Sequence, residues 1–187
     1  MAYTHLTTTT VGTAANSVAF TGISQSYQHL HFIIHAGSTG RNSSSAQYGF
    51  DNLSLSTTGV GSGNYSYTYS RWNYDGSWIG QTGSASTTKW EYNYVQYAND
   101  GSSDGVMNHI EVYLPNYTDT NQDQVGFCYS TCVWPETSGG ISSIYWGQAM
   151  THCHMDKTSA LSAFTFESDV GNFIVGSTFS LYGIAGS

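Results

Sequence analysis

The stretch Leu30-His-Phe-Ile-Ile-His-Ala36 decides the fold class of this chain, because apolar and polar side chains alternate along it. Successive side chains of a β-strand point to opposite sides, so the residues at positions 30, 32, 34 and 36 share one face. The same alternation recurs in His109-Ile-Glu-Val-Tyr-Leu114, in 161–166 and in 179–182. A shift of one residue would reverse each face, so these patterns also fix the register of the strands.

Clusters of Gly, Ser, Asn and Asp separate many such segments, and no stretch shows the 3.6-residue period of a helix. Many strands spaced by polar turns are typical of a sandwich or barrel. The sequence therefore predicts an all-β fold, a jelly-roll β-sandwich. We expect strands near 3–11, 17–22, 28–36, 47–55, 64–73, 87–97, 106–114, 124–133, 143–153, 160–168 and 173–184.

The two ends of the chain carry a matched pair of strand-like segments, 17–34 and 173–184. They predict one sheet domain, residues 1–187, in which strands from the two ends meet. Residues 1–12, with threonine at positions 7 to 10, have high β propensity and little to bury. We expect them to act as an N-terminal arm that adds to the sheet of a neighbouring subunit.

Charged residues make up only 9% of the chain, against about 25% in a typical globular protein. Four residues are basic and the net charge is −8, which argues against a nucleic-acid partner, because phosphates need several cations. No apolar run approaches the length of a membrane span, and the start lacks the pattern of a signal peptide. A surface this poor in ions favours permanent packing against neighbours or contact with neutral polar ligands.

The three cysteines do not predict a disulfide framework. Cys128 and Cys132 are four residues apart in one expected strand, about 13 Å along it, whereas a bridge needs Cα atoms within about 7 Å. Cys153 lies on another strand. We expect reduced, buried thiols and no zinc site built from them, because no Cys-x-x-Cys spacing exists.

Histidine is the one enriched ionisable residue, with seven copies. His29 and His31 share a strand face, and so do His152 and His154, and such pairs can chelate a metal ion. A third ligand is not evident, so the favoured interpretation is a polar sheet face or a subunit interface. We expect neither a metal centre nor a cofactor.

Glycosidases of the jelly-roll type need two facing carboxyl groups, about 5–9.5 Å apart. The candidates carried by strands are Glu91, Glu111 and Glu167. Their flanking residues match no glycosidase signature, and exposed, solvated carboxylates are the favoured interpretation. No triad, phosphate-binding loop or dinucleotide fingerprint is present either, so we expect no catalytic residues.

Aromatic residues gather between positions 65 and 78. Tyr65, Tyr67 and Tyr69 share one strand face, and Trp72 and Trp78 follow. Three interpretations stay open: buried packing, a subunit interface, and a platform on which sugars stack.

Four segments have a pattern in common with a known family: 18–30, Asn64-Tyr-Ser66, 110–117, and the closing Gly176-Ser-Thr-Phe-Ser-Leu-Tyr-Gly-Ile184. They resemble the virion structural proteins of tailed phages from marine and freshwater samples, and they occur in the expected order. The Gly-Ser-x-Phe-x-Leu-Tyr-Gly-Ile ending is the most specific part. The chain departs from the family at Gly49-Phe-Asp-Asn-Leu53, where members often carry a longer Phe-Asn-Gly-Asp type of segment.

The resemblance implies a jelly-roll module that decorates phage heads or builds fibres and tail appendages, with no catalytic residues. We therefore expect a non-enzymatic virion protein, made in the bacterial cytoplasm, that acts as a capsid decoration or cement protein. Its expected partners are copies of itself, as a homotrimer, and the major capsid protein or other virion proteins. A tail-fibre module that binds host glycans and a glycosidase stay open as alternatives.

Overall fold

Every regular element in the described part of the chain is a β-strand. The computed structural model describes residues 2–39, 53–58, 60–72, 78–93, 108–135, 144–157, 159–169 and 171–186. The strands are β1 (Tyr3–Thr10), β2 (Ser17–Phe20), β3 (His29–Ala36), β4 (Leu53–Thr57), β5 (Val60–Trp72), β6 (Trp78–Thr87), β7 (Trp90–Asn93), β8 (Asn108–Leu114), β9 (Gln124–Pro135), β10 (Ile144–Lys157), β11 (Phe164–Ser168) and β12 (Thr178–Ile184).

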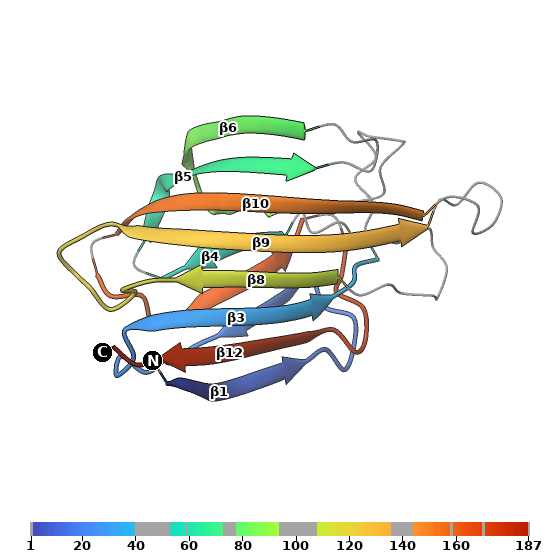
Figure 1. Ribbon diagram of the computed structural model, residues 1–187. Coiled ribbons are helices and arrows are strands. Elements are labelled where there is room, and N and C mark those ends of the chain that lie inside the picture. The colour runs from blue at the N-terminus through green and yellow to red at the C-terminus, as the bar shows by residue number, and fades with distance from the viewer. Residues whose placement is uncertain are drawn as a thin grey trace.

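The strands form two antiparallel sheets that pack face to face. The large sheet has eight strands in the order β1-β12-β3-β8-β9-β10-β5-β6, and the small sheet has four in the order β2-β11-β4-β7. Figure 1 views the molecule from the side of the large sheet, with β4 behind it. From β1 to β5, consecutive strands alternate between the two sheets: β1, β3 and β5 belong to the large sheet, and β2 and β4 belong to the small one. The predicted all-β fold and β-sandwich are confirmed.

Strands from the two ends of the chain meet, as the sequence predicts. β12 lies between β1 and β3, with Leu181 opposite Phe32 of β3 and opposite Thr7 of β1. The N- and C-termini consequently lie close together in Figure 1. The segment expected to be an arm, residues 1–12, instead contributes β1 to the sheet of its own chain, because β12 offers it a free edge with a matching register.

The core lies between the sheets and is built from the apolar halves of the alternating strands. Along β3, the residues at positions 30, 32, 34 and 36 are buried, and along β8 so are Ile110, Val112 and Leu114. Phe32 of the large sheet meets Phe20 of β2 and Phe166 of β11, with ring centroids 5.3 and 5.0 Å apart. These edge-on contacts hold the two sheets together.

The predicted strands differ from the observed ones in one missing strand and in several strand boundaries. β6 was not expected, because its glycines and serines resemble a turn cluster. It is an edge strand whose order comes from pairing with β5. Residues 173–177 were expected in a strand, yet they form an isolated bridge and a turn in which Gly176 has a φ of 91°. Parts of five expected strands, 47–52, 73, 94–97, 106–107 and 143, lie outside the described residues.

A substitution at Gly126 of β9 would test how tightly the core is packed. A Cβ atom at this position would lie 2.5 Å from Cζ3 of the buried Trp90. We expect Gly126→Ala to lower the free energy of unfolding by about 1–3 kcal/mol, because overpacking forces neighbours out of place. Gly12→Ala is the matched control, since no atom lies within 4 Å of its Cβ position. Urea unfolding measures both, and equal midpoints would contradict the packing described.

Candidate functional site

All seven histidines lie on one surface, the side of the large sheet that faces away from the small one. Burial alternates along β3 from Leu30, along β8 and along the described part of β10, and the histidines of these stretches occupy the outward positions. His5 of β1 and His29 at the start of β3 join them through ring contacts with Tyr182 and Tyr113. We call this surface the outer face. Among the residues whose side chains are described, its aromatic, apolar and ionisable members are Tyr3, His5, His29, His31, Ile33, His35, Trp72, His109, Glu111, Tyr113, Val125, Phe127, Tyr129, Met150, His152, His154, Asp156 and Tyr182.

Strand pairing aligns these side chains in rows that cross the sheet. One row runs in register through six strands as His5, Tyr182, His31, Tyr113, Phe127 and His152. Ring contacts connect several neighbours in it: His5 and Tyr182 have centroids 5.3 Å apart, as do Phe127 and His152. A row of rings therefore crosses the middle of the outer face.

The outer face also holds most of the large exposed apolar side chains in the described part of the chain. Six of the seven large apolar side chains that are exposed there belong to it, with Phe127 at 42% and Met150 at 48%. The seventh, Val175, lies in the turn before β12. Exposed apolar side chains that gather on one face mark a contact surface, whereas scattered ones need no explanation.

A chain of hydrogen bonds runs through the centre of the outer face. One carboxylate oxygen of Glu111 accepts from His109 Nε2 at 2.8 Å, and its other oxygen lies 3.1 Å from His31 Nε2. The remaining ring nitrogen of His109, Nδ1, lies 3.0 Å from Nε2 of His35. The hydrogen bond from His109 and the nearby imidazoles lower the pKa of Glu111, against a smaller opposing effect of burial.

Other described charges include Asp156 on the outer face and Lys157, which is buried and donates hydrogen bonds to Tyr117 O and Gln124 Oε1. Asp123 pairs with His154 at 2.9 Å, close to where β9 begins. Lys89 pairs with Glu167 of β11 and with Asp169, at 3.2 and 3.1 Å. Burial lowers the pKa of Lys89, but hydrogen bonds to these carboxylates outweigh it and leave the pKa raised.

The carboxylates considered for glycosidase chemistry are not brought together. Glu111 lies on the outer face of the large sheet, whereas Glu167 points away from the core on the small sheet, next to the inward Phe166. The two carboxyl groups are thus on opposite sides of the sandwich. Glu91 belongs to β7, and its side chain lies outside the described part.

The histidines considered as metal ligands form two separate pairs. His29 and His31 belong to β3 and His152 and His154 to β10, with β8 and β9 between them. Three strand spacings amount to about 14 Å. His29 Nδ1 moreover accepts the backbone N–H of Asn116 at 3.1 Å. Across the described ranges, no three His, Cys, Asp or Glu side chains gather as metal ligands.

The tyrosines considered for an interface or a glycan platform do share a face, but it is the inner one. Tyr65, Tyr67 and Tyr69 are all buried. Trp72, three residues further along β5, is 40% exposed on the outer face. Trp78 is the backbone partner of Trp72 in β6, and its side chain lies outside the described part. Of these five candidates, Trp72 is the one with a described, exposed ring.

Tyr65 gives a testable pH dependence. Burial raises its pKa to about 12, against an opposing hydrogen bond with Thr57. The folded protein therefore keeps a proton that the unfolded chain loses above pH 10, so this contribution to stability is present below pH 10 and disappears as pH rises toward 12. By pH 11 the loss is about 1 kcal/mol. Urea unfolding at pH 9 and pH 11 should show a smaller decline in Tyr65→Phe than in the wild type, and equal declines would contradict the assignment.

Two cysteines lie in the core. Cys128 of β9 and Cys153 of β10 are free and buried, and burial raises the pKa of both thiols. Buried thiols with raised pKa values are poor nucleophiles. The prediction of reduced, buried thiols is confirmed for these two, and the side chain of Cys132 is outside the described part.

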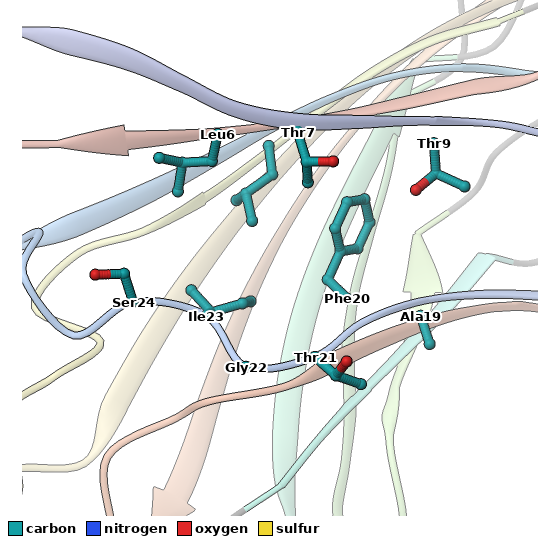
Figure 2. A pocket seen from close by; sticks show the side chains of 10 residues that line it. Leu6, Thr7, Thr9, Ala19, Phe20, Thr21, Gly22, Ile23 and Ser24 are labelled. Atoms are coloured by element: carbon teal, nitrogen blue, oxygen red, sulfur yellow. The ribbon is translucent and has the colours of Figure 1, made fainter.

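A hollow of about 360 Å³ lies between β1 and the segment that follows β2. Figure 2 shows Leu6 and Thr7 on one side of it, facing Phe20 and Ile23 on the other. β1 and β2 are edge strands of the two sheets, so the hollow lies at an open side of the sandwich. Its lining consists of apolar groups and hydroxyls without an ionisable side chain, so the lining offers no group for acid–base chemistry.

Comparison of the chain with protein-family models, with curated proteins and with solved structures finds no match. Among the described residues there is no helix of the length and apolarity that crossing a membrane requires.

Five residues of the outer face were not among the site residues predicted from the sequence. His35, His109, Phe127, Tyr129 and Met150 were not singled out. Their signal was present, because each occupies the position opposite to the buried residues of its strand. What was missing was the strand order, which brings four separate segments side by side.

Proposed function

We propose that this chain is a non-enzymatic structural protein of a tailed-phage virion, a capsid decoration protein with a jelly-roll sandwich. In this proposal it is made in the bacterial cytoplasm, assembles as a homotrimer through its outer face, and stabilises the assembled shell. The resemblance of four sequence segments to phage virion proteins supports the virion context. The concentration of exposed apolar side chains on the outer face carries the proposal of self-assembly.

Electrostatics favour a second copy of the chain as the occupant of the outer face. The chain carries a net charge of −8, so two copies repel each other over most approaches. The centre of the outer face carries one described carboxylate, Glu111, which is paired with histidines. Phe127, Tyr129 and Met150 lie beside it without a charge of their own. Copies that meet here bury apolar surface with little repulsion, as interface cores do.

Exposed rings on the same face favour one second candidate, a tail-fibre or appendage module that binds host glycans. Phe127, Tyr129 and Trp72 are each more than a third exposed, with 42, 37 and 40% of their surface accessible. Rings presented in this way can stack on neutral sugars. The exposed side of a sheet suits a protein partner better than a small ligand, which is usually bound in a concave site.

The proposed function is tested by adding the purified chain to capsids that lack it. A protein that binds only the assembled shell stabilises it by mass action. We expect saturable binding at a fixed number of copies per capsid and a higher temperature of DNA release. A control with disassembled capsid protein should show no binding. Absence of binding to capsids, together with binding to host glycans, would contradict decoration and support the second candidate.

A further inference from the structure

His35 and His109 form a cross-strand pair that the proposed function does not use. They are direct backbone partners on β3 and β8, and both side chains lie on the outer face. Nε2 of His35 and Nδ1 of His109 are 3.0 Å apart, with ring centroids separated by 5.0 Å. Two imidazole nitrogens this close share either one proton or one metal ion.

Glu111 determines which ring nitrogen of His109 carries the hydrogen and which carries the lone pair. Its carboxylate lies 2.8 Å from His109 Nε2, which therefore carries the hydrogen, because a carboxylate accepts. In neutral His109, the lone pair is then on Nδ1, the atom that faces His35. A histidine that donates its other N–H to a carboxylate is the usual arrangement around a protein-bound metal, where the carboxylate orients the ring and raises its basicity.

We propose that His35 Nε2 and His109 Nδ1 bind a divalent transition-metal ion of the Cu²⁺ or Ni²⁺ class, with Glu111 as the positioning residue for His109. Two nitrogens 3.0 Å apart and about 2.0–2.1 Å from a metal ion subtend roughly 94° at it. That angle matches the cis positions of tetragonal or octahedral coordination, which Cu²⁺ and Ni²⁺ adopt. Tetrahedral Zn²⁺ fits less well and should bind more weakly.

The surroundings of the pair are compatible with a cation. The strand neighbours of the pair on the outer face are Thr178, the partner of His35 on β12, and Thr131, the partner of His109 on β9. Neither carries a positive charge, and Glu111 adds a negative one. In the single chain His109 is 36% exposed, so ions in solution have access to the pair wherever a second copy does not cover it. Two protein ligands leave the remaining coordination positions to water.

Calorimetric titration of the purified, untagged protein with Ni²⁺ tests the proposal, and electron paramagnetic resonance with Cu²⁺ reports nitrogen ligands. We expect one ion per chain and two coordinating nitrogens. His35→Ala and His109→Ala should each lose at least about 10-fold in affinity and show one nitrogen fewer. Glu111→Gln should lose about 10-fold while keeping both nitrogens, as expected for removal of an orienting carboxylate.

The matched control is the double variant His152→Ala/His154→Ala, which removes two histidines from the same face at β10. It should bind like the wild type. Wild-type affinity in His35→Ala and His109→Ala, or an equal loss in the control, would overturn the proposal in favour of non-specific binding to a histidine-rich face. Circular-dichroism melting of each variant verifies the fold, and His109→Asn is the replacement if His109→Ala does not fold. The result is independent of capsid binding, because the measurement uses the isolated protein.

Discussion

Phe127→Asp is expected to dissociate the self-associated protein into monomers while leaving the fold intact. Phe127 lies in the row of rings that crosses the outer face, and 42% of its surface is exposed in the single chain. If copies pack through this face, the substitution buries an unpaired carboxylate at the contact. Central aromatic side chains of interfaces commonly contribute about 2 kcal/mol or more. We therefore expect self-association to weaken by at least about 30-fold.

Sedimentation velocity over a range of protein concentrations measures this effect. Val175→Asp is the matched control, because Val175 is 61% exposed but lies in the turn before β12, apart from the outer face. It introduces the same charge and should leave the association unchanged. Equal association of wild type and Phe127→Asp would show that the outer face is not the contact surface. Thermal melting of the dissociated variant should remain close to that of the wild-type monomer.

Phe32→Ala is expected to have the largest effect on folding. Phe32 is fully buried in β3, and its ring contacts Phe20, Phe164 and Phe166 of the small sheet, with centroid distances of 5.3, 5.5 and 5.0 Å. Removing it deletes a ring that contacts three phenylalanines across the two sheets and leaves a cavity. Such truncations cost about 3–5 kcal/mol, a large share of the 5–15 kcal/mol that typically stabilises a domain.

The neighbouring residue provides the control for this substitution. Ile33 follows Phe32 on the same strand but points to the outer face, where it is only partly buried. Ile33→Ala should therefore cost much less. Urea unfolding of both variants gives the comparison. A similar loss of stability in the two would mean that the alternation of β3 does not separate the core from the surface as described.

The fold class was predictable because alternation determines which side of each strand is buried. In β3 and β8 the predicted and observed inward positions agree residue by residue. The meeting of strands from the two chain ends was also predictable, and β12 pairs with β3. β6 was not predictable, because its glycines and serines have the pattern of a turn. This segment is a strand because it pairs with β5 at the edge of the sheet.

The candidate site was less predictable than the fold. The three tyrosines of β5 share a face, as the sequence indicates, but alternation alone does not say whether that face is inward. The pair His35 and His109 joins residues 74 positions apart in the chain. Only the adjacency of β3 and β8 brings them together, and strand order is not encoded in a local pattern. The sequence pattern places histidines side by side within a strand, whereas the structure also pairs them across strands.

Electron cryo-microscopy of the virion that carries this chain tests the central claim most directly. We predict density for the chain repeated over the capsid lattice, with the outer face of one copy in contact with a second copy. Phe127, Tyr129 and Met150 should then be buried at that contact. Density confined to the tail or to a unique vertex, or an outer face open to solvent in every copy, would contradict it.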